Sequence, residues 1–347
     1  MAASVSAGSS LLRYLGVRFL LIFPTIFILV TMVFIVMRLV GDPITASQGG
    51  KLSSEQLQLL IEEAGYNRPI LVQYFEYMFS VFTGDFGTTI TDNQPVAALL
   101  LKYGIATLEL VVYSLIVAFI VGFPLGMIAA KKRDTGTDAG LRLFAILAYA
   151  TPVFFVGLLL KLVFAVTFPI FPVAGRVSVR SQLALTAMED PSGFYLIDAI
   201  RLSDSEIIAD VLSHAVLPAT ALGLLTAGVF LRLVRTNMIS TLGADYIDAG
   251  RSRGISETRL LTQNAFRPAL IPIITVVGMQ IALLLSGAVL TETTFEWKGL
   301  GFQLAEYLSA RDYVAVQGIV ALLAIIVALT NFLVDILVAL VDPRVKF

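Results

Sequence analysis

Six long apolar runs alternate with polar segments along the chain. They cover residues 17–40, 105–130, 141–168, 211–234, 270–290 and 314–341. A helix that crosses the hydrocarbon core of a bilayer needs about 20 mostly apolar residues, and each run meets this length. The pattern therefore predicts an all-α membrane protein with six transmembrane helices. Because the first run is too long for a cleaved signal peptide, we expect it to remain as an anchor.

The polar segments between the runs predict two domains. Residues 1–103 hold the anchor helix and a first outer segment, in which Ser53 or Ser54, with Gln56 or Glu55 close behind, favours the start of a short amphipathic helix. Residues 104–341 hold the other five runs. Within them, residues 169–210 form an acidic insertion rich in loop-forming residues, which we expect to extend away from the membrane.

Composition supports the membrane assignment. The 347 residues are 57% hydrophobic and 14% charged, whereas a soluble domain carries about 25% charged residues. Cysteine is absent and His214 is the single histidine, which excludes disulfide frameworks, thiol chemistry and Cys/His metal sites. No metal site is expected.

Charge divides unevenly between the two sides of the predicted membrane helices. If the N-terminus lies inside, basic residues outnumber acidic ones in every longer inner segment, and acidic residues prevail outside. Cytoplasmic loops carry an excess of Lys and Arg. We therefore expect a multi-pass protein of the cytoplasmic (inner) membrane with both termini in the cytoplasm.

No motif for catalysis is present. Lys51 follows Gly50, but Leu52 stands where a phosphate-binding loop needs Ser or Thr for magnesium. A nucleophile elbow, a zinc motif and a carboxylate pair are also missing. We expect no catalytic residue, so any ATP-driven transport must use an ATPase on another subunit.

The polar segment 243–268 is the most informative stretch of the chain. It is basic, contains Gly250 and Gly254, and separates two apolar runs. We expect it to form short helices outside the bilayer, with a turn at Gly254, since glycine adopts positive φ freely. Asp248 is placed near a helix start, or to pair with Arg251 or Arg253 one turn later. The alternative is that the arginines only enforce topology.

Three polar residues fall within the apolar runs. Glu109, Asn331 and Asp335 are expected to face the protein interior, because charges in a bilayer are costly. Glu109 either meets a charged group of a substrate or pairs with a neighbour. Asn331 and Asp335 are four residues apart, a spacing that suits interhelical hydrogen bonds. We favour structural roles for all three.

Short motifs spread along the chain carry a family resemblance. They are Gly41-Asp42-Pro43, Arg68-Pro69 with Gln73-Tyr74, Gly84-Asp85-Phe86-Gly87, Ala106-Thr107-Leu108-Glu109-Leu110, Asp245-Tyr246-Ile247, Pro268-Ala269-Leu270-Ile271-Pro272, Leu290-Thr291-Glu292-Thr293 with Gly299-Leu300-Gly301, and Asn331-Phe332-Leu333-Val334-Asp335 before Asp342-Pro343-Arg344. Together they resemble the first (B-type) transmembrane permease of the dipeptide/oligopeptide branch of ABC importers, over nearly the whole chain. The segment Asp248-Ala249-Gly250 with Gly254 is similar to that family's coupling loop, which reads Glu-Ala-Ala, three residues, Gly.

The resemblance implies the type I importer permease fold, with residues 104–341 as the permease domain. It implies a heterodimer with a second related permease, two cytoplasmic ABC ATPase subunits that hold ATP and magnesium, and an extracytoplasmic substrate-binding protein. This chain itself would hold no cofactor. The expected function is ATP-driven import of dipeptides or oligopeptides.

Two sets of residues receive roles from the resemblance. Those expected to couple to the ATPases are Tyr246, Asp248, Ala249, Gly250, Arg251, Arg253 and Gly254. Those expected in the outer loop that meets the binding protein are Glu292, Phe295, Trp297, Gly299 and Gly301.

Two alternatives stay open at this point. Importers of the same class carry nickel complexes, glutathione or oligosaccharides. A protein of another class, a secondary transporter driven by an ion gradient, would normally show internal inverted repeats, and no repeat is visible here.

Overall fold

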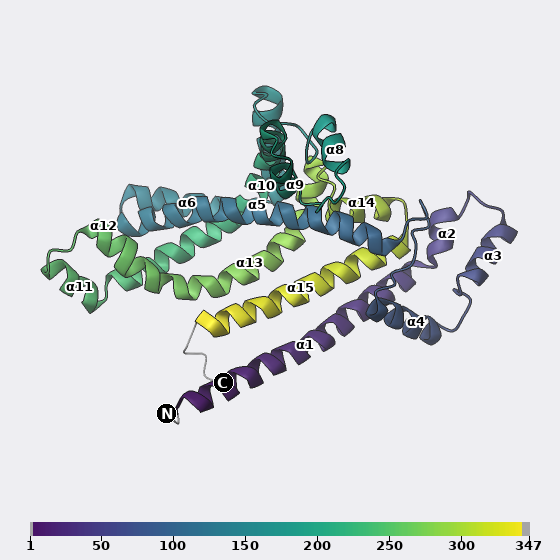
Figure 1. Ribbon diagram of the computed structural model, residues 1–347, viewed down its shortest axis with the longest axis horizontal. Helices are drawn as coiled ribbons and strands as arrows, with labels where there is room; N and C mark the ends of the chain where they lie inside the picture. The colour runs from purple at the N-terminus through teal and green to yellow at the C-terminus, as the bar shows by residue number, and fades with distance from the viewer. Residues whose placement is uncertain (1–2, 342–347) are drawn as a thin grey trace. The chain divides into compact units, whose positions relative to one another are not determined.

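The computed structural model of the chain describes residues 3–341, and within them it contains helices and no β-strand (Figure 1). The chain divides into two compact units. The first consists of residues up to Thr107 together with Lys298–Phe332, and the second of Leu108–Trp297 together with the residues from Leu333 onward. The first unit thus contains the predicted N-terminal domain and, in addition, a later segment of the chain.

The first unit is built on the N-terminal helix. Its complete helices are α1 (Ala3–Val40), α2 (Pro43–Gln48), α3 (Ser54–Glu63), α4 (Ile70–Thr83) and α14 (Leu300–Ser309). It also holds the start of α5 (Val96–Lys131) and most of α15 (Tyr313–Val341). Helix α3 begins with a capping box between Ser53 and Gln56, which selects Ser53 from the two predicted N-cap residues.

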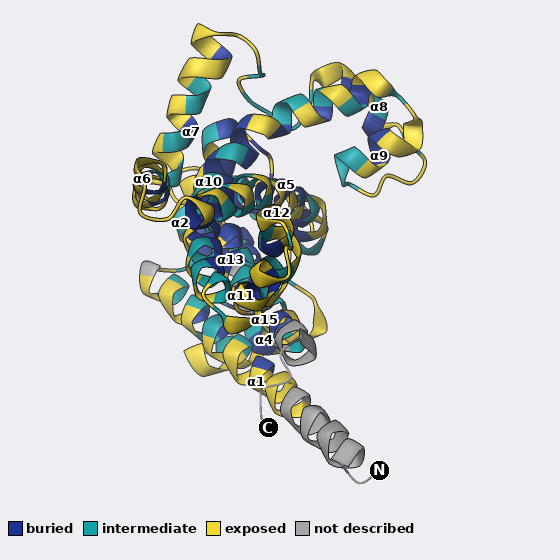
Figure 2. Ribbon diagram, turned by 90° about the vertical axis from the view of Figure 1, so that its left-hand side faces the viewer, coloured by how far each residue is buried: buried dark blue, intermediate teal, exposed yellow. Residues whose placement is uncertain are grey.

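The second unit holds the remaining helices. They are α6 (Gly136–Ala150), α7 (Val153–Lys161) with a π-helical extension η1 (Leu162–Thr167), α8 (Val179–Thr186), α9 (Tyr195–Leu202), α10 (Ser205–Leu242), α11 (Asp245–Ser252), α12 (Glu257–Arg259), η2 (Leu260–Ala265) and α13 (Phe266–Phe295). Helix α10 is the most deeply buried of the long helices and packs against α6, α7, α9 and α13 (Figure 2).

Small residues let α5 approach α10 closely. A Cβ atom on Gly122 would lie 2.7 Å from the Ala227 carbonyl oxygen, and one on Gly223 would lie 2.6 Å from the Ser114 carbonyl oxygen. Close approach of this kind is the usual basis of helix association in a bilayer, where hydrophobic burial between helices contributes little.

Four helices are long and apolar enough to cross a membrane, at 16–39, 96–131, 205–242 and 313–334. Two further spans result if each of two bent pairs counts as one: Gly136–Ala150 with Val153–Thr167, bent by 103°, and Glu257–Leu270 with Pro272–Leu285, bent by 51°. The fold class and the six apolar segments are therefore confirmed. The third apolar run, 141–168, is divided between α6, α7 and η1 by a sharp bend at Pro152. Pro152 disfavours helical geometry at Thr151, where α6 ends in an extended conformation.

The insertion 169–210 is more regular than its loop-forming residues suggest. It contains α8, α9 and the first turn of α10 (Figure 1). These helices share a small apolar core made of Leu185, Ala199, Ile207 and Val211. The insertion is thus a folded helical element.

Candidate functional site

The predicted coupling segment folds as two short helices that precede α13. Helix α11 ends at Ser252, and Gly254 follows with φ +78°, so the predicted turn is present. The Ile255 amide donates to the Gly250 carbonyl at 3.1 Å, which closes the end of the helix. Beyond the turn, α12 and η2 lead directly into α13.

Ile247 anchors α11 to the membrane helices. Its side chain is fully buried, although it lies in a polar, eight-residue helix. It packs in an apolar cluster drawn from α5, α10, η2 and α13, whose other buried members are Ala130, Val234, Met238, Leu260, Ala265, Ala269 and Ile273. A displacement of α11 must therefore move α10 and α13 or disrupt this cluster. Ile247 belongs to the Asp245-Tyr246-Ile247 motif but received no predicted role of its own, although its place between polar neighbours fits a one-sided apolar face.

Gly250 lies in close contact with η2. It is buried, and a Cβ atom on it would lie 2.8 Å from the Leu260 Cδ2 atom. Contacts under 3.0 Å force a neighbour to shift. The glycine therefore lets α11 lie directly against η2 without a shift of the Leu260 side chain.

Arg251 links α11 to α12 across the Gly254 turn. Its guanidinium lies 2.8 Å from an Asp248 carboxylate oxygen and 2.7 Å from one of Glu257. The hydrogen bond with Glu257 and, next, its charge raise the pKa of Arg251. The pairing of Asp248 with Arg251 was predicted. The bond to Glu257 was missed because it crosses the Gly254 turn, where helical spacing gives no guide.

The outward face of α11 carries the remaining predicted residues. Tyr246 is 48% exposed, and Ala249 and Arg253 are also exposed. The segment thus combines a buried anchor, an ion-paired cluster and an open face, which is a suitable surface for a protein partner.

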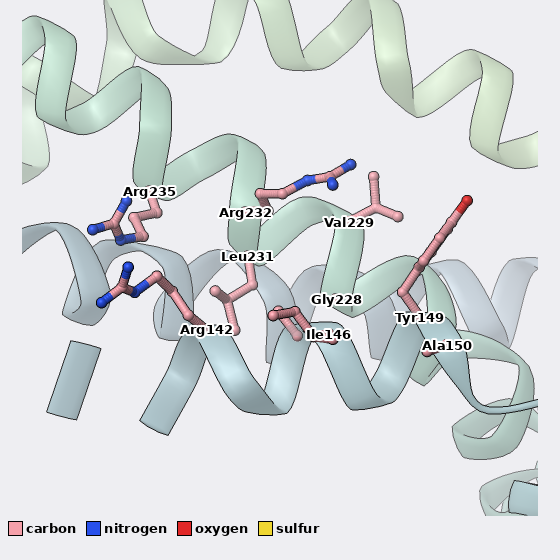
Figure 3. A pocket seen from close by; sticks show the side chains of 10 residues that line it. Arg142, Ile146, Tyr149, Ala150, Gly228, Val229, Leu231, Arg232 and Arg235 are labelled. Carbon is pink, nitrogen blue, oxygen red and sulfur yellow. The ribbon is translucent and has the colours of Figure 1, made fainter. Parts of the chain in front are cut away.

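A buried ion pair joins α6 to α10 at the same end of the unit. Asp138, whose side chain is 0% exposed, accepts two hydrogen bonds from the Arg235 guanidinium, at 2.6 and 2.7 Å. Arg142 lies 3.7 Å from the same carboxylate. These two arginines and Arg232 line one end of an apolar cavity of about 240 Å³ between α6 and α10, and Tyr149 lies at the other end (Figure 3).

Glu109 is held by its neighbours within the second unit. Its carboxylate pairs with Arg176, accepts from the Tyr113 hydroxyl at 2.8 Å and accepts from the Leu196 amide at 3.1 Å. The predicted structural role of Glu109 agrees with these contacts. Arg176 was missed, because its place beside Glu109 depends on the fold of the insertion.

A mutual contact cannot be described for the other two intramembrane candidates, Asn331 and Asp335. Asn331 is exposed, and the side chain of Asp335 lies outside the described residues. Their predicted mutual hydrogen bonding stays a prediction.

The predicted outer-loop side chains face inward in this structure. Glu292 and Trp297 are fully buried and Phe295 is 2% exposed. Trp297 packs edge-on against the Tyr113 ring at 6.4 Å. Gly299 precedes α14 and Gly301 is buried in its first turn. The described conformation thus gives these residues packing contacts, and their contact with a binding protein stays a prediction.

Comparison with known proteins identifies the family. Residues 122–347 match the family described as "Binding-protein-dependent transport system inner membrane component", and residues 11–123 match the N-terminal family of the same transport systems. The chain is 36% identical to the dipeptide transport system permease protein DppB of Escherichia coli (strain K12), over 97% of this chain and 98% of that protein.

Two further relatives are also permease proteins of peptide transport systems. The di/tripeptide transport system permease protein DppB of Pseudomonas aeruginosa (strain UCBPP-PA14) is 35% identical over 97% of this chain and 99% of its own length. The oligopeptide transport system permease protein AppB of Bacillus subtilis (strain 168) is 31% identical over 96% and 99%.

Among solved structures, the fold is similar to a chain of the MetNI methionine ABC transporter in an inward-facing form. The TM-score is 0.52 at 16% identity, and the likeness covers 72% of this chain and 98% of that one. The six apolar segments, the packed coupling segment and these matches lead to one conclusion: the chain belongs to the family of inner-membrane permease components of binding-protein-dependent ABC transport systems.

Proposed function

We propose that this chain is the first of two permease subunits of an ATP-driven importer of dipeptides and oligopeptides. The observation that supports the cargo most is 36% identity, over nearly full length, to a dipeptide transport permease. The second permease, two cytoplasmic ATPases and an extracytoplasmic binding protein complete the proposed complex. ATP and magnesium bind the ATPases, and this chain has no ATPase site of its own.

The coupling segment carries the proposed mechanism. Closure of the ATPase pair pushes on the exposed face of α11, and the Ile247 cluster transmits this movement to α10 and α13. The pathway then alternates between outward- and inward-facing states. This assignment places residues 243–268 and both termini in the cytoplasm, in agreement with the excess of basic residues in the inner segments.

The cargo is tested by uptake of a radiolabelled dipeptide in cells with and without this chain. We expect uptake to be lost on deletion, and to be competed by unlabelled tripeptide and not by nickel or cellobiose. Competition by nickel or cellobiose alone would reassign the cargo to the other substrates of the class. Unchanged uptake in cells that lack any other peptide importer would contradict the peptide assignment.

Gly254→Asp is expected to abolish uptake while leaving the amount of protein in the membrane unchanged. A Cβ atom at Gly254 would meet no neighbour within 4 Å, so the chain accommodates a side chain there. The φ of +78° costs a non-glycine residue about 1 kcal/mol, which applies to any substitution. Aspartate, in addition, adds a negative charge and bulk to the surface that is proposed to meet the ATPase.

Gly254→Ala serves as the matched control, because alanine has at least the backbone strain of aspartate at this φ and carries no charge. Uptake and membrane content are measured for both variants. Retained uptake in Gly254→Asp would contradict the coupling assignment, as would equal loss in both variants, which would indicate backbone strain alone.

A further inference from the structure

A polar cavity in the first unit has no role in the proposed transport cycle. It has a volume of about 300 Å³ and is lined by α1, α4, α15 and the turns on either side of α4. Two motifs of the family resemblance contribute to it, through Gln73 and through Asp85-Phe86-Gly87. The volume is several times the roughly 30 Å³ of a single water molecule.

Several buried polar atoms at this cavity lack a partner within the described part of the chain. They are the Arg38 Nε, the Gln73 Oε1 and the Tyr77 hydroxyl. Gln317, which is 7% exposed, also lines the cavity and offers both donors and an acceptor. Buried polar groups are nearly always hydrogen-bonded, so three unpartnered atoms at one cavity indicate a bound polar ligand.

The orientation of these groups is fixed by the surrounding fold. The Gln73 amide nitrogen donates to the Tyr66 and Arg68 carbonyls, at 2.9 and 2.7 Å, so its oxygen is left to accept from a ligand. The Arg38 guanidinium lies over the Tyr66 ring at 4.5 Å. Tyr77 stacks on Phe34, with ring centroids 5.6 Å apart.

The cavity lining includes side chains of both charges, Arg38 and Asp85. Arg38 and the hydroxyl of Tyr77 are donors that suit a phosphate. Burial raises the pKa of the Tyr77 phenol, so it keeps its proton. Gln73 Oε1 and the carboxylate of Asp85 are acceptors that suit a primary ammonium group. A ligand with both a phosphate and an amine matches this arrangement.

The cavity lies at the edge of the lipid. Arg38 is in the last turn of α1, at the end of the apolar span 16–39. The outer face of α4 exposes a stripe of large apolar side chains, namely Ile70, Leu71, Phe75, Phe79 and Phe82. An amphipathic helix of this kind lies in the membrane interface with its apolar face among the acyl chains.

We propose that this cavity binds the phosphoethanolamine headgroup of a membrane phospholipid. Arg38 and Tyr77 hold the phosphate, Gln73 and Asp85 hold the ammonium, and Gln317 contributes a further hydrogen bond. The acyl chains run along the exposed apolar faces of α1 and α4. The lipid thereby fills the junction between the anchor helix and the interfacial helix.

The test is native mass spectrometry of the full chain, delipidated in detergent and titrated with phosphatidylethanolamine, phosphatidylglycerol or phosphatidylcholine of matched acyl chains. We expect phosphatidylethanolamine to bind most tightly, because phosphatidylcholine lacks N–H donors and phosphatidylglycerol lacks the cation. Tyr77→Phe keeps the stacked ring and removes one hydrogen bond, so binding should weaken about fivefold.

Tyr74→Phe is the matched control. It makes the same chemical change one turn earlier on α4, where the hydroxyl bonds Thr31 at 2.7 Å and does not line the cavity. Lipid binding should be unchanged in this variant. Equal affinity for the three lipids, or equal effects of the two tyrosine variants, would overturn the proposal. Soluble phosphoethanolamine binding as tightly as the lipid would also overturn it, by showing that the acyl chains contribute nothing.

Discussion

Replacing Ile247 with alanine is expected to reduce substrate uptake by at least about tenfold without removing the protein from the membrane. The fully buried side chain is the main apolar contact that holds α11 on the membrane helices. Truncation of a buried isoleucine to alanine costs about 2–5 kcal/mol. Because α11 has only eight residues and an otherwise polar surface, a loss of this size is enough to detach it. The push of the ATPases would then no longer reach α10 and α13.

The measurement is uptake normalised to the amount of chain in the membrane fraction, with Ile247→Val as the graded control. Valine removes a single methylene and costs about 1 kcal/mol, so most uptake should remain. An alanine variant that transports as well as the valine variant would show that α11 does not need this anchor to transmit movement.

Replacing Asp138 with alanine is expected to give the largest loss of stability. The substitution leaves the guanidinium of Arg235, which is 17% exposed, without its carboxylate, and places it near Arg142 with no counter-charge. Removing one partner of a buried ion pair costs about 3–5 kcal/mol. Since Arg235 keeps some access to solvent, we expect the lower end, about 3 kcal/mol. This corresponds to a fall of roughly 5 °C in the apparent melting temperature of the purified chain.

Asp134→Asn provides the comparison, because Asp134 lies four residues earlier with φ +62°, which asparagine also adopts, and its ion pair with Arg133 is exposed, with 73% and 61% of the two side chains accessible. Exposed pairs contribute about 0–1 kcal/mol, so its melting temperature should barely change. Equal melting temperatures for the two variants would show that the Asp138–Arg235 pair does not hold α6 against α10.

The features that could be predicted from the sequence are those set by local pattern. Apolar run length located the membrane segments, because the bilayer imposes a minimum length on every span. Gly254 marked the turn of the coupling segment, since few other residues adopt its φ of +78°. The pairing of Asp248 with Arg251 followed from helical spacing.

The features that could not be predicted depend on tertiary contacts. The carboxylate of Glu109 meets Arg176, 67 residues away, and Asp138 meets Arg235, 97 residues away. Neither pair leaves a local signal in the sequence. Trp297, expected on an outer loop, is fully buried, because position between apolar runs does not determine which way a side chain packs. Pro152 is a local signal for a bend in the third span, but the size of that bend, 103°, does not follow from the apolar pattern.

The central claim is that this chain is driven by ATPase partners through its coupling segment. The most direct measurement is the energy source of the dipeptide uptake that depends on this chain, tested in cells treated with orthovanadate or with a protonophore under conditions that maintain cellular ATP. Uptake that is blocked by orthovanadate and persists with the protonophore is the predicted result. Uptake that resists orthovanadate and stops when the proton gradient is removed would contradict the account and indicate a secondary transporter.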